Sequence, residues 1–192
     1  MQKPVKIIGV DPGSVVMGYS ILSVQGHVLE LVTMDVLKLS GKDDSYQRLQ
    51  AIYECIAGVI KVHKPQQFAI EAPFFGKNVQ SMLKLGRAQG VAIAAAIAAG
   101  LPVAEYPPKR VKQSVTGNGN ADKEQVYRML THLMPLGDAP QYFDASDALA
   151  VAVCHHLNTK LLGIAPKVRS AAKKGSWENF VTQNPDRLRQ VP

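Results

Sequence analysis

The chain has few cysteines, no long hydrophobic run and only 6% aromatic residues. Its two cysteines, Cys55 and Cys154, are far apart and lack the spacing of a zinc site, which excludes a disulfide scaffold and favours a reducing compartment. The longest apolar stretch, Val91–Ala99, is about half as long as a membrane-spanning helix. No hydrophobic region of the signal-peptide kind precedes the first strand pattern. We therefore expect a cytoplasmic protein that does not enter a membrane.

Acidic residues are scarce in the middle of the chain. The net charge is +7 over 192 residues, and the segment 76–128 alone contains eight basic and three acidic residues, a balance of +5. A basic segment of this kind is typical of a polyanion-binding face, because Lys and Arg release counterions from phosphates. A solvated surface that happens to be basic is the alternative. Charge by itself does not decide between the two.

The order of strand and helix patterns predicts the fold class. The expected strands are Val5–Val10, Met17–Val24, His27–Leu39, Phe68–Ile70 and Leu101–Tyr106. The expected helices cover Leu49–Ile60, Val79–Ala99, a segment from an N-cap at Asn120 to about Met134, and a last helix that begins near Tyr142. Three strands followed by alternating helices and strands indicate an α/β fold with a mixed central sheet flanked by helices on both faces.

The composition changes near the end of the chain. From about Ile164, basic residues are spread among Ser, Gln, Asn and Pro, with few large apolar residues. We expect one domain over residues 1–162 and a basic tail over 163–192 that is flexible in isolation. The tail is either a solvated extension or an additional contact with DNA or another partner.

Four carboxylates stand at positions that would bring them together. Asp11 ends the first strand and Glu71 ends a later one, and the ends of neighbouring parallel strands meet at one edge of a sheet. Asp144 and Asp147 are three residues apart at the start of the last helix and therefore share a face. If this helix start lies at the same edge, the carboxylates repel one another unless a cation intervenes. The pattern predicts a site for a pair of hard divalent ions, Mg²⁺ or Mn²⁺, which suits phosphodiester hydrolysis.

Each carboxylate also has a structural interpretation. Asp11 lies in an Asp-Pro-Gly turn, and such turns are common. Asp144 and Asp147 could be acidic residues of a first helical turn, which the helix dipole favours. Glu71 is harder to explain in this way, because it directly follows three apolar strand residues and is costly to place without a partner.

An ordered set of motifs resembles the RuvC family of Holliday-junction resolvases. In chain order, the motifs are Ile7–Ser14 with Gly18-Tyr19, Ala69–Glu71 followed by Phe74 and Lys77-Asn78, Lys84–Gly86 with Gly90-Val91, Val111–Gln113 with Gly117, Gly119 and Lys123, and Asp144–Ala150. The match is colinear from about Lys6 to about His156. One motif alone is weak, but the ordered set is specific.

The resemblance implies a ribonuclease H-like fold and a homodimer that nicks two strands of like polarity at a four-way DNA junction. It implies that Mg²⁺ is the cofactor, two ions per site with Mn²⁺ as a substitute, and that RuvA and RuvB are partners. The implied catalytic and metal-binding residues are Asp11, Glu71, Asp144 and Asp147. The implied DNA contacts are Phe74, Lys77, Lys84, Arg87, Lys112 and Lys123. Phe74 matches an aromatic residue that stacks on bases at the junction centre, and its neighbour Phe75 is the alternative for that role.

Other functions are compatible with parts of the pattern. An actin-like ATPase or sugar kinase shares the Asp-x-Gly opening, but it needs a second phosphate loop and a larger adenosine-binding domain. A junction-binding module without activity is opposed by the four carboxylates, which would hinder DNA binding in the absence of metal. Another nuclease of the same fold, acting on single strands or RNA–DNA hybrids, is the main alternative, because residue types at a metal centre do not distinguish these substrates.

Overall fold

A five-stranded sheet forms the centre of the molecule in the computed structural model, which describes residues 3–73, 78–136 and 142–161. The strands are β1 (Val5–Asp11), β2 (Val16–Gln25), β3 (Val28–Lys38), β4 (Gln67–Glu71) and β5 (Val103–Tyr106), and their order in the sheet is β3-β2-β1-β4-β5. The pairs β1–β2 and β2–β3 are antiparallel, whereas β1–β4 and β4–β5 are parallel. The sheet is therefore mixed, as predicted.

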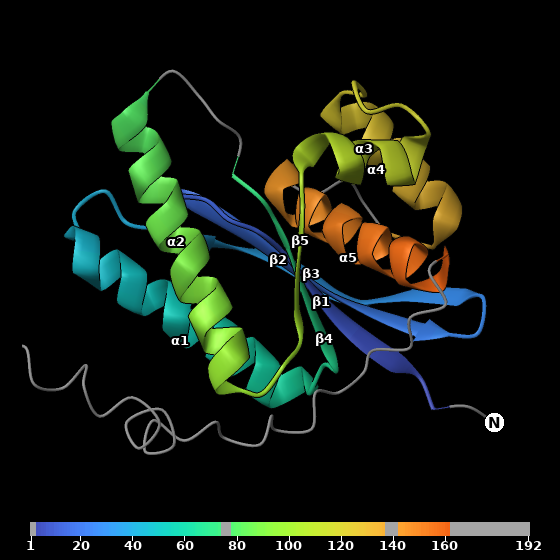
Figure 1. Cartoon of the computed structure of the whole chain (residues 1–192), viewed down its shortest axis with the longest axis horizontal. Helices are drawn as coiled ribbons and strands as arrows, with labels where there is room; N and C mark the ends of the chain where they lie inside the picture. The colour runs from blue at the N-terminus through green and yellow to red at the C-terminus, as the bar shows by residue number, and fades with distance from the viewer. Residues whose placement is uncertain (1–2, 74–77, 137–141, 162–192) are drawn as a thin grey trace, which may run out of the picture.

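Helices cover both faces of this sheet (Figure 1). The helices α1 (Ser45–His63) and α2 (Val79–Ala98) lie on one face, and α3 (Pro108–Thr116), α4 (Lys123–Leu133) and α5 (Phe143–Leu161) lie on the other. Alternate residues of β1 serve the two cores: Ile8 and Val10 pack with α1 and α2, whereas Ile7 packs with the helices of the other face. The predicted fold class, α/β with helices on both faces, is confirmed.

Two helices differ from the sequence-based prediction. The helix α4 begins after Asp122 rather than after Asn120, because Asp122 accepts the backbone N–H of Gln125 while the Gln125 side chain accepts that of Asp122. Asn120 instead donates its N–H to the side chain of Asn118 in the preceding loop. The helix α3 was not predicted, since Pro107-Pro108 indicates a strand end; Pro108 occupies the first position of α3, where proline is favoured.

Glycines in the sheet allow α5 to approach β1 and β2 very closely. A Cβ atom on Gly9 would overlap the carbonyl oxygen of Ala148, and one on Gly18 would overlap the carbonyl oxygen of Asp144. Both glycines are in strand interiors, where a missing side chain commonly marks the close approach of another backbone. The start of α5 is thereby fixed against the end of β1.

The described part of the chain ends with α5, and the expected basic tail 163–192 lies outside the described residues. None of the described helices combines the length and hydrophobicity that a membrane span requires.

Candidate active site

Asp11 and Glu71 leave the sheet at the same edge. β1 and β4 are parallel neighbours in which Val10 lies opposite Ile70, and each carboxylate residue follows directly. Both residues are partly buried. The parallel register explains why two acidic residues 60 positions apart in the sequence come together.

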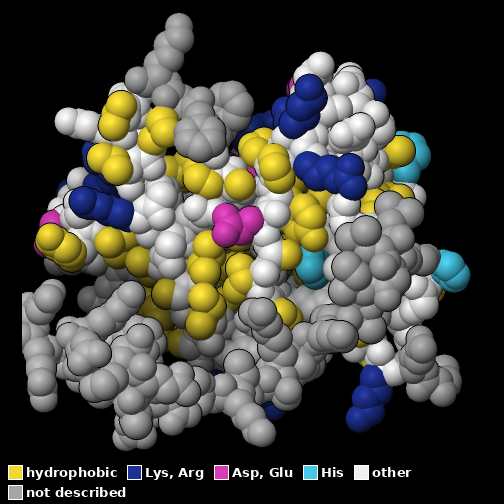
Figure 2. Space-filling view, viewed as in Figure 1, with side chains coloured by type: hydrophobic (Ala, Val, Ile, Leu, Met, Phe, Trp, Pro, Cys, Tyr) yellow, Lys and Arg dark blue, Asp and Glu magenta, His cyan; other side chains and the backbone are white. Residues whose placement is uncertain are grey.

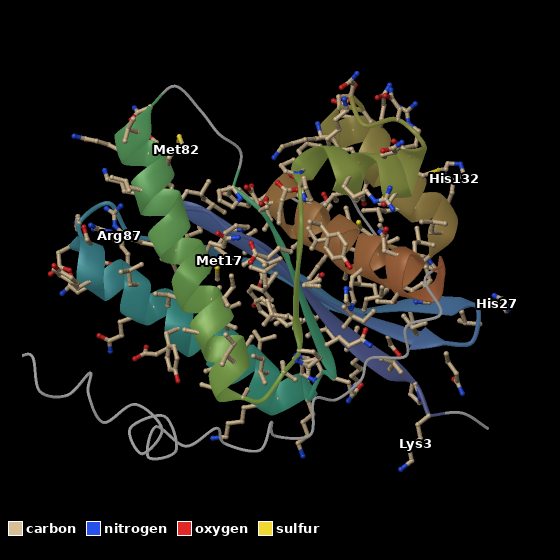
Figure 3. All side chains as sticks on the ribbon, in the orientation of Figure 1. Lys3, Met17, His27, Met82, Arg87 and His132 are labelled. Atoms are coloured by element: carbon tan, nitrogen blue, oxygen red, sulfur yellow. The ribbon has the colours of Figure 1, made fainter. Side chains whose placement is uncertain are left out.

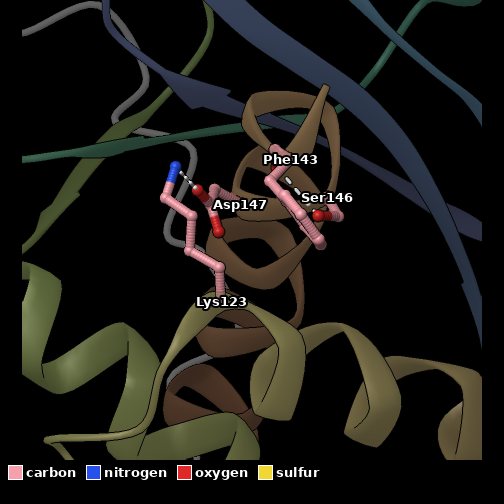
Figure 4. A network of polar contacts seen from close by, with 4 residues as sticks. All are labelled: Lys123, Phe143, Ser146 and Asp147. Carbon is pink, nitrogen blue, oxygen red and sulfur yellow. Dashed lines mark hydrogen bonds and ion pairs between the residues drawn. The ribbon is translucent and has the colours of Figure 1, made fainter. Parts of the chain in front are cut away.

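The other two carboxylates come from the first turns of α5. Gly18 lies opposite Asp11 in the β1–β2 ladder, and the carbonyl group of Asp144 packs on Gly18. The backbone of Asp144 is thereby placed beside the end of β1. One turn further on, Asp147 points toward Lys123 of α4 (Figure 4). At the start of α5, the Ser146 hydroxyl donates a hydrogen bond of 2.8 Å to the carbonyl oxygen of Phe143 (Figure 4).

The pKa values show that the four carboxylates share one electrostatic environment. Burial, followed by the charges of Glu71, Asp147 and Asp144, raises the pKa of Asp11 well above its ordinary value. Burial and the charge of Asp147 raise the pKa of Glu71 from 4.5 to about 7. Like charges held together in a partly buried site penalise ionisation. The four carboxylates therefore carry more negative charge than the neighbouring cationic groups compensate.

Lys123 supplies part of the compensating positive charge. Its Nζ atom lies 2.7 Å from an Oδ atom of Asp147 (Figure 4). Burial acts to lower the pKa of Lys123, but the hydrogen bond to Asp147 and the nearby carboxylates outweigh it, so the pKa is raised. Burial nevertheless raises the pKa of Asp147, although Lys123 acts against it. One ammonium group does not compensate the carboxylates.

The carboxylate oxygens suit a hard cation, although the side chains do not yet lie close enough together to coordinate one. Within residues 3–73, 78–136 and 142–161, no three His, Cys, Asp or Glu side chains are close enough to hold a metal ion as they stand. The acidic ligands offer only carboxylate oxygens, which Mg²⁺ and Mn²⁺ prefer, and Lys123 compensates their charge only in part. The side chains would have to draw together around an ion.

The missed helix α3 brings a second lysine to the site. Lys112 is partly buried on α3, and its charge acts to lower the pKa values of Glu71 and Asp147. Lys112 and Lys123 thus flank the carboxylates from two helices on the same face of the sheet. Their contact with the scissile DNA stays a prediction.

The predicted role of Lys112 is a contact with a DNA phosphate. On that prediction, Lys112→Ala should slow cleavage about 10- to 100-fold at saturating protein and make the salt dependence of DNA binding shallower by about one unit of slope. Single-turnover cleavage and binding titrations from 50 to 300 mM salt measure both quantities. Lys109→Ala, at an exposed position of the same helix, is the control. Wild-type values in both assays would exclude this role of Lys112.

Two of the remaining expected DNA contacts lie away from the carboxylates. Lys84 and Arg87 are exposed on α2, on the opposite face of the sheet from α5. Phe74 and Lys77 lie outside the described residues, as does Phe75.

A buried polar chain that the sequence did not reveal ties α5 to the sheet behind Glu71. The hydroxyl of Tyr106 lies 2.8 Å from Nδ1 of His155, and Nε2 of His155 lies 3.0 Å from the side-chain oxygen of Gln67. Tyr106 is the β5 partner of Glu71. Burial lowers the pKa of His155 to about 4, so the imidazole is neutral at physiological pH. Its role is structural, because its two ring nitrogens connect Tyr106 and Gln67. The feature of the sequence that could have indicated this polar chain is a histidine on the apolar face of α5.

Comparison with known proteins identifies the family. The family model for crossover junction endodeoxyribonuclease RuvC matches residues 7–155. A crossover junction endodeoxyribonuclease RuvC of Cytophaga hutchinsonii is 50% identical over 186 residues, which cover 97% of this chain and 89% of that protein. That of Porphyromonas gingivalis is 50% identical over 186 residues, which cover 95% of this chain and 96% of that protein.

A solved structure agrees in fold. RuvC of Thermus thermophilus in complex with a Holliday junction substrate has a TM-score of 0.77 and 31% identity, and the match covers 82% of this chain and 96% of that chain. The expected ribonuclease H-like fold is confirmed, and nucleases of this family are metal-dependent. The matched range contains all four carboxylates and both lysines of the site. The chain belongs to the RuvC family of crossover junction endodeoxyribonucleases.

Proposed function

We propose that this chain resolves Holliday junctions in homologous recombination and DNA repair, and that it hydrolyses phosphodiesters at Asp11, Glu71, Asp144 and Asp147. The observation that carries the site is geometric: two adjacent strand ends and the start of α5 bring these carboxylate residues to one edge of the sheet. There, burial and the charges of Glu71, Asp147 and Asp144 raise the pKa of Asp11. Membership of the family supports the junction as substrate and endonucleolytic cleavage as the reaction.

Two Mg²⁺ ions per site, replaceable by Mn²⁺, are proposed to balance this charge. Asp11 and Glu71 would hold them from the strand ends, and Asp144 and Asp147 from α5. When bound, such a pair supplies an activated water for attack on phosphorus and stabilises the leaving 3′ oxygen. The tight packing of α5 on Gly18 keeps the helix-borne ligands in a fixed relation to Asp11.

The two lysines are proposed to bind the DNA backbone around the scissile phosphodiester. The side chain of Lys123 is 54% exposed, so its ammonium group can exchange Asp147 for a phosphate oxygen. Lys112 approaches the same carboxylates from α3. Backbone contacts of this kind position DNA without reading its sequence, so selectivity for junctions would come from geometry.

Paired nicks require two active sites, and the proposed working unit is therefore a homodimer. The nuclease domain is proposed to span residues 1–162, with 163–192 as a basic tail. RuvA and RuvB are proposed as partners and the cytoplasm as the location, in line with the family. Phe74 is proposed to stack on bases at the junction centre, and Lys77 to contact the DNA beside it.

A cleavage assay with Mg²⁺ tests the proposed function. A mobile four-way junction, a linear duplex and an RNA–DNA hybrid are compared with wild-type protein, Asp11→Asn and, as a control for a lost exposed carboxylate, Asp35→Asn. We expect paired symmetric nicks in the junction alone, lost only in Asp11→Asn. Cleavage of the hybrid instead would move the protein to another nuclease class. Tight junction binding without cleavage in Mg²⁺ or Mn²⁺ would indicate an architectural module.

A further inference from the structure

A basic pocket lies between the start of α1 and the middle of α2. Its volume is about 350 Å³, and three cationic side chains line it: Arg48 of α1 and Lys84 and Arg87 of α2. Ser14, from the connection between β1 and β2, closes another side. Figure 3 shows Arg87 beside the start of α1, and Figure 2 shows Lys and Arg side chains gathered at this place on the surface.

The positive charge of the pocket is not neutralised from within. Asp43 and Asp44 also line it, but an Oδ atom of Asp44 already accepts the backbone N–H groups of Tyr46 and Gln47 as the cap of α1. In the parts of the chain that the structure covers, the ion pair with N and O atoms within 4.0 Å is Lys123 with Asp147, at the active site. Among these residues, none of the three cationic groups of the pocket forms such a pair. The pocket therefore retains an excess of one positive charge.

Arg48 carries an unsatisfied donor at this place. Its Nε atom is buried and has no hydrogen-bond partner among the described residues. A buried donor without an acceptor destabilises the fold, the more so when the group is charged, so a ligand that supplies an acceptor relieves a penalty already present in the fold. Arginine presents its donors in a planar fork that matches the oxygens of a phosphate, and the Ser14 hydroxyl adds one more donor.

The position of the pocket connects it to the catalytic edge. Ser14 follows Asp11 by three residues, and three residues span at most about 10 Å. Because every nucleotide of a strand carries a phosphate, a DNA strand with one phosphodiester at the carboxylates has further phosphates on both sides of it. One of these, a few nucleotides away, can reach the pocket beside Ser14.

We propose that the pocket formed by Ser14, Arg48, Lys84 and Arg87 binds a phosphate of the DNA backbone, distinct from the phosphodiester that is cut. This inference rests on the proposed function, and it adds Arg48 and Ser14 to the DNA-binding surface. The pocket fixes the path of the DNA beyond the active site, on the side of the sheet that α1 and α2 cover.

Junction binding in EDTA, titrated over a range of KCl concentrations, tests the pocket. Arg48→Ala is expected to weaken binding about tenfold and to lower the slope of log affinity against log salt by about one. Arg48→Lys should keep the slope but lose part of the affinity, because the charge stays and the fork is lost. Lys61→Ala, which removes an exposed charge in the last turn of α1, is the matched control and should resemble the wild type.

NMR of the Arg48 Nε–H group distinguishes DNA from a small anion. We expect junction DNA to shift this signal at micromolar concentration and inorganic phosphate only at millimolar concentration. Saturation by inorganic phosphate with no response to the junction would overturn the proposal, as would an Arg48→Ala variant that binds like Lys61→Ala. If Arg48→Ala does not fold, as judged by thermal unfolding, Arg87→Ala takes its place. Nicking by the wild type, measured in parallel, distinguishes failure of the pocket proposal from failure of the proposed function. If the wild type nicks junctions and Arg48→Ala binds them with unchanged affinity, only the pocket proposal is refuted. If the wild type neither binds nor nicks junctions, the proposed function is refuted.

Discussion

Glu71→Gln is expected to stabilise the metal-free protein by about 3 kcal/mol at pH 8 and to lower nicking at least about a thousandfold. Burial and Asp147 raise the pKa of Glu71 from 4.5 to about 7, so the folded state binds more protons than the unfolded state between these pH values. The stability of the wild type therefore falls as pH rises from about 4.5 to about 7, and the loss is complete above this range. Glutamine resembles the protonated carboxyl and avoids the loss, but it is a poor ligand for a divalent ion.

Denaturant unfolding in EDTA at pH 4.5, 6 and 8 checks the stability difference, which should grow from near zero to its full value. Adding Mg²⁺ at pH 8 should stabilise the wild type more than the variant, because ligands that bind only the folded state shift the equilibrium toward it. Glu54→Gln on α1, at an exposed position, should change the free energy of unfolding by less than about 0.5 kcal/mol. A Glu71→Gln protein that nicks junctions at the wild-type rate would remove Glu71 from the site.

Gly18→Ala is expected to abolish most cleavage although all four carboxylates remain. The added Cβ would overlap the carbonyl oxygen of Asp144, so either the start of α5 moves or the overlap persists as strain. Overpacking of this kind costs about 1–3 kcal/mol of stability. A displacement of about 1 Å at a reacting centre can cost about a hundredfold in rate, and we expect a loss at least that large.

Gly58→Ala is the matched control, because it adds the same methyl group inside α1, where nothing lies within 4 Å. It should stabilise the protein by about 0.5–1 kcal/mol, since glycine is unfavourable in a helix interior, and it should leave nicking intact. Thermal unfolding and single-turnover cleavage of the two variants give the comparison. Equal stability and equal cleavage of Gly18→Ala and the wild type would contradict the close packing of α5 on β2.

The sheet and most helices could be predicted because their signals are local. Asp11 and Glu71 each end an apolar strand, and a parallel register then brings them to one edge. The boundary of α4 was decided by competition between two capping residues, and the reciprocal hydrogen bonds of Asp122 and Gln125 favour the later start. Pro107-Pro108 was ambiguous, because proline both ends a strand and begins a helix.

The parts that could not be predicted depend on contacts between distant elements. Nothing in the sequence around Arg48 indicates that it meets Lys84 and Arg87, because that meeting follows from how α1 packs on α2. The polar chain from Gln67 through Tyr106 to His155 likewise joins three elements. The sequence places Gly9 and Gly18 in predicted strands, but only the path of α5 shows that their missing side chains leave room for its backbone.

β1 occupies the middle of the sheet, with a paired strand on each side and a hydrophobic core against each face. The backbone that leads to Asp11 therefore cannot fray by itself, because opening it disrupts both cores at once. Local openings have low free energies where few buried contacts are broken, and this strand is at the opposite extreme. We therefore expect the amide hydrogens of β1 to exchange with solvent only on global unfolding, and thermal inactivation to coincide with global unfolding rather than precede it.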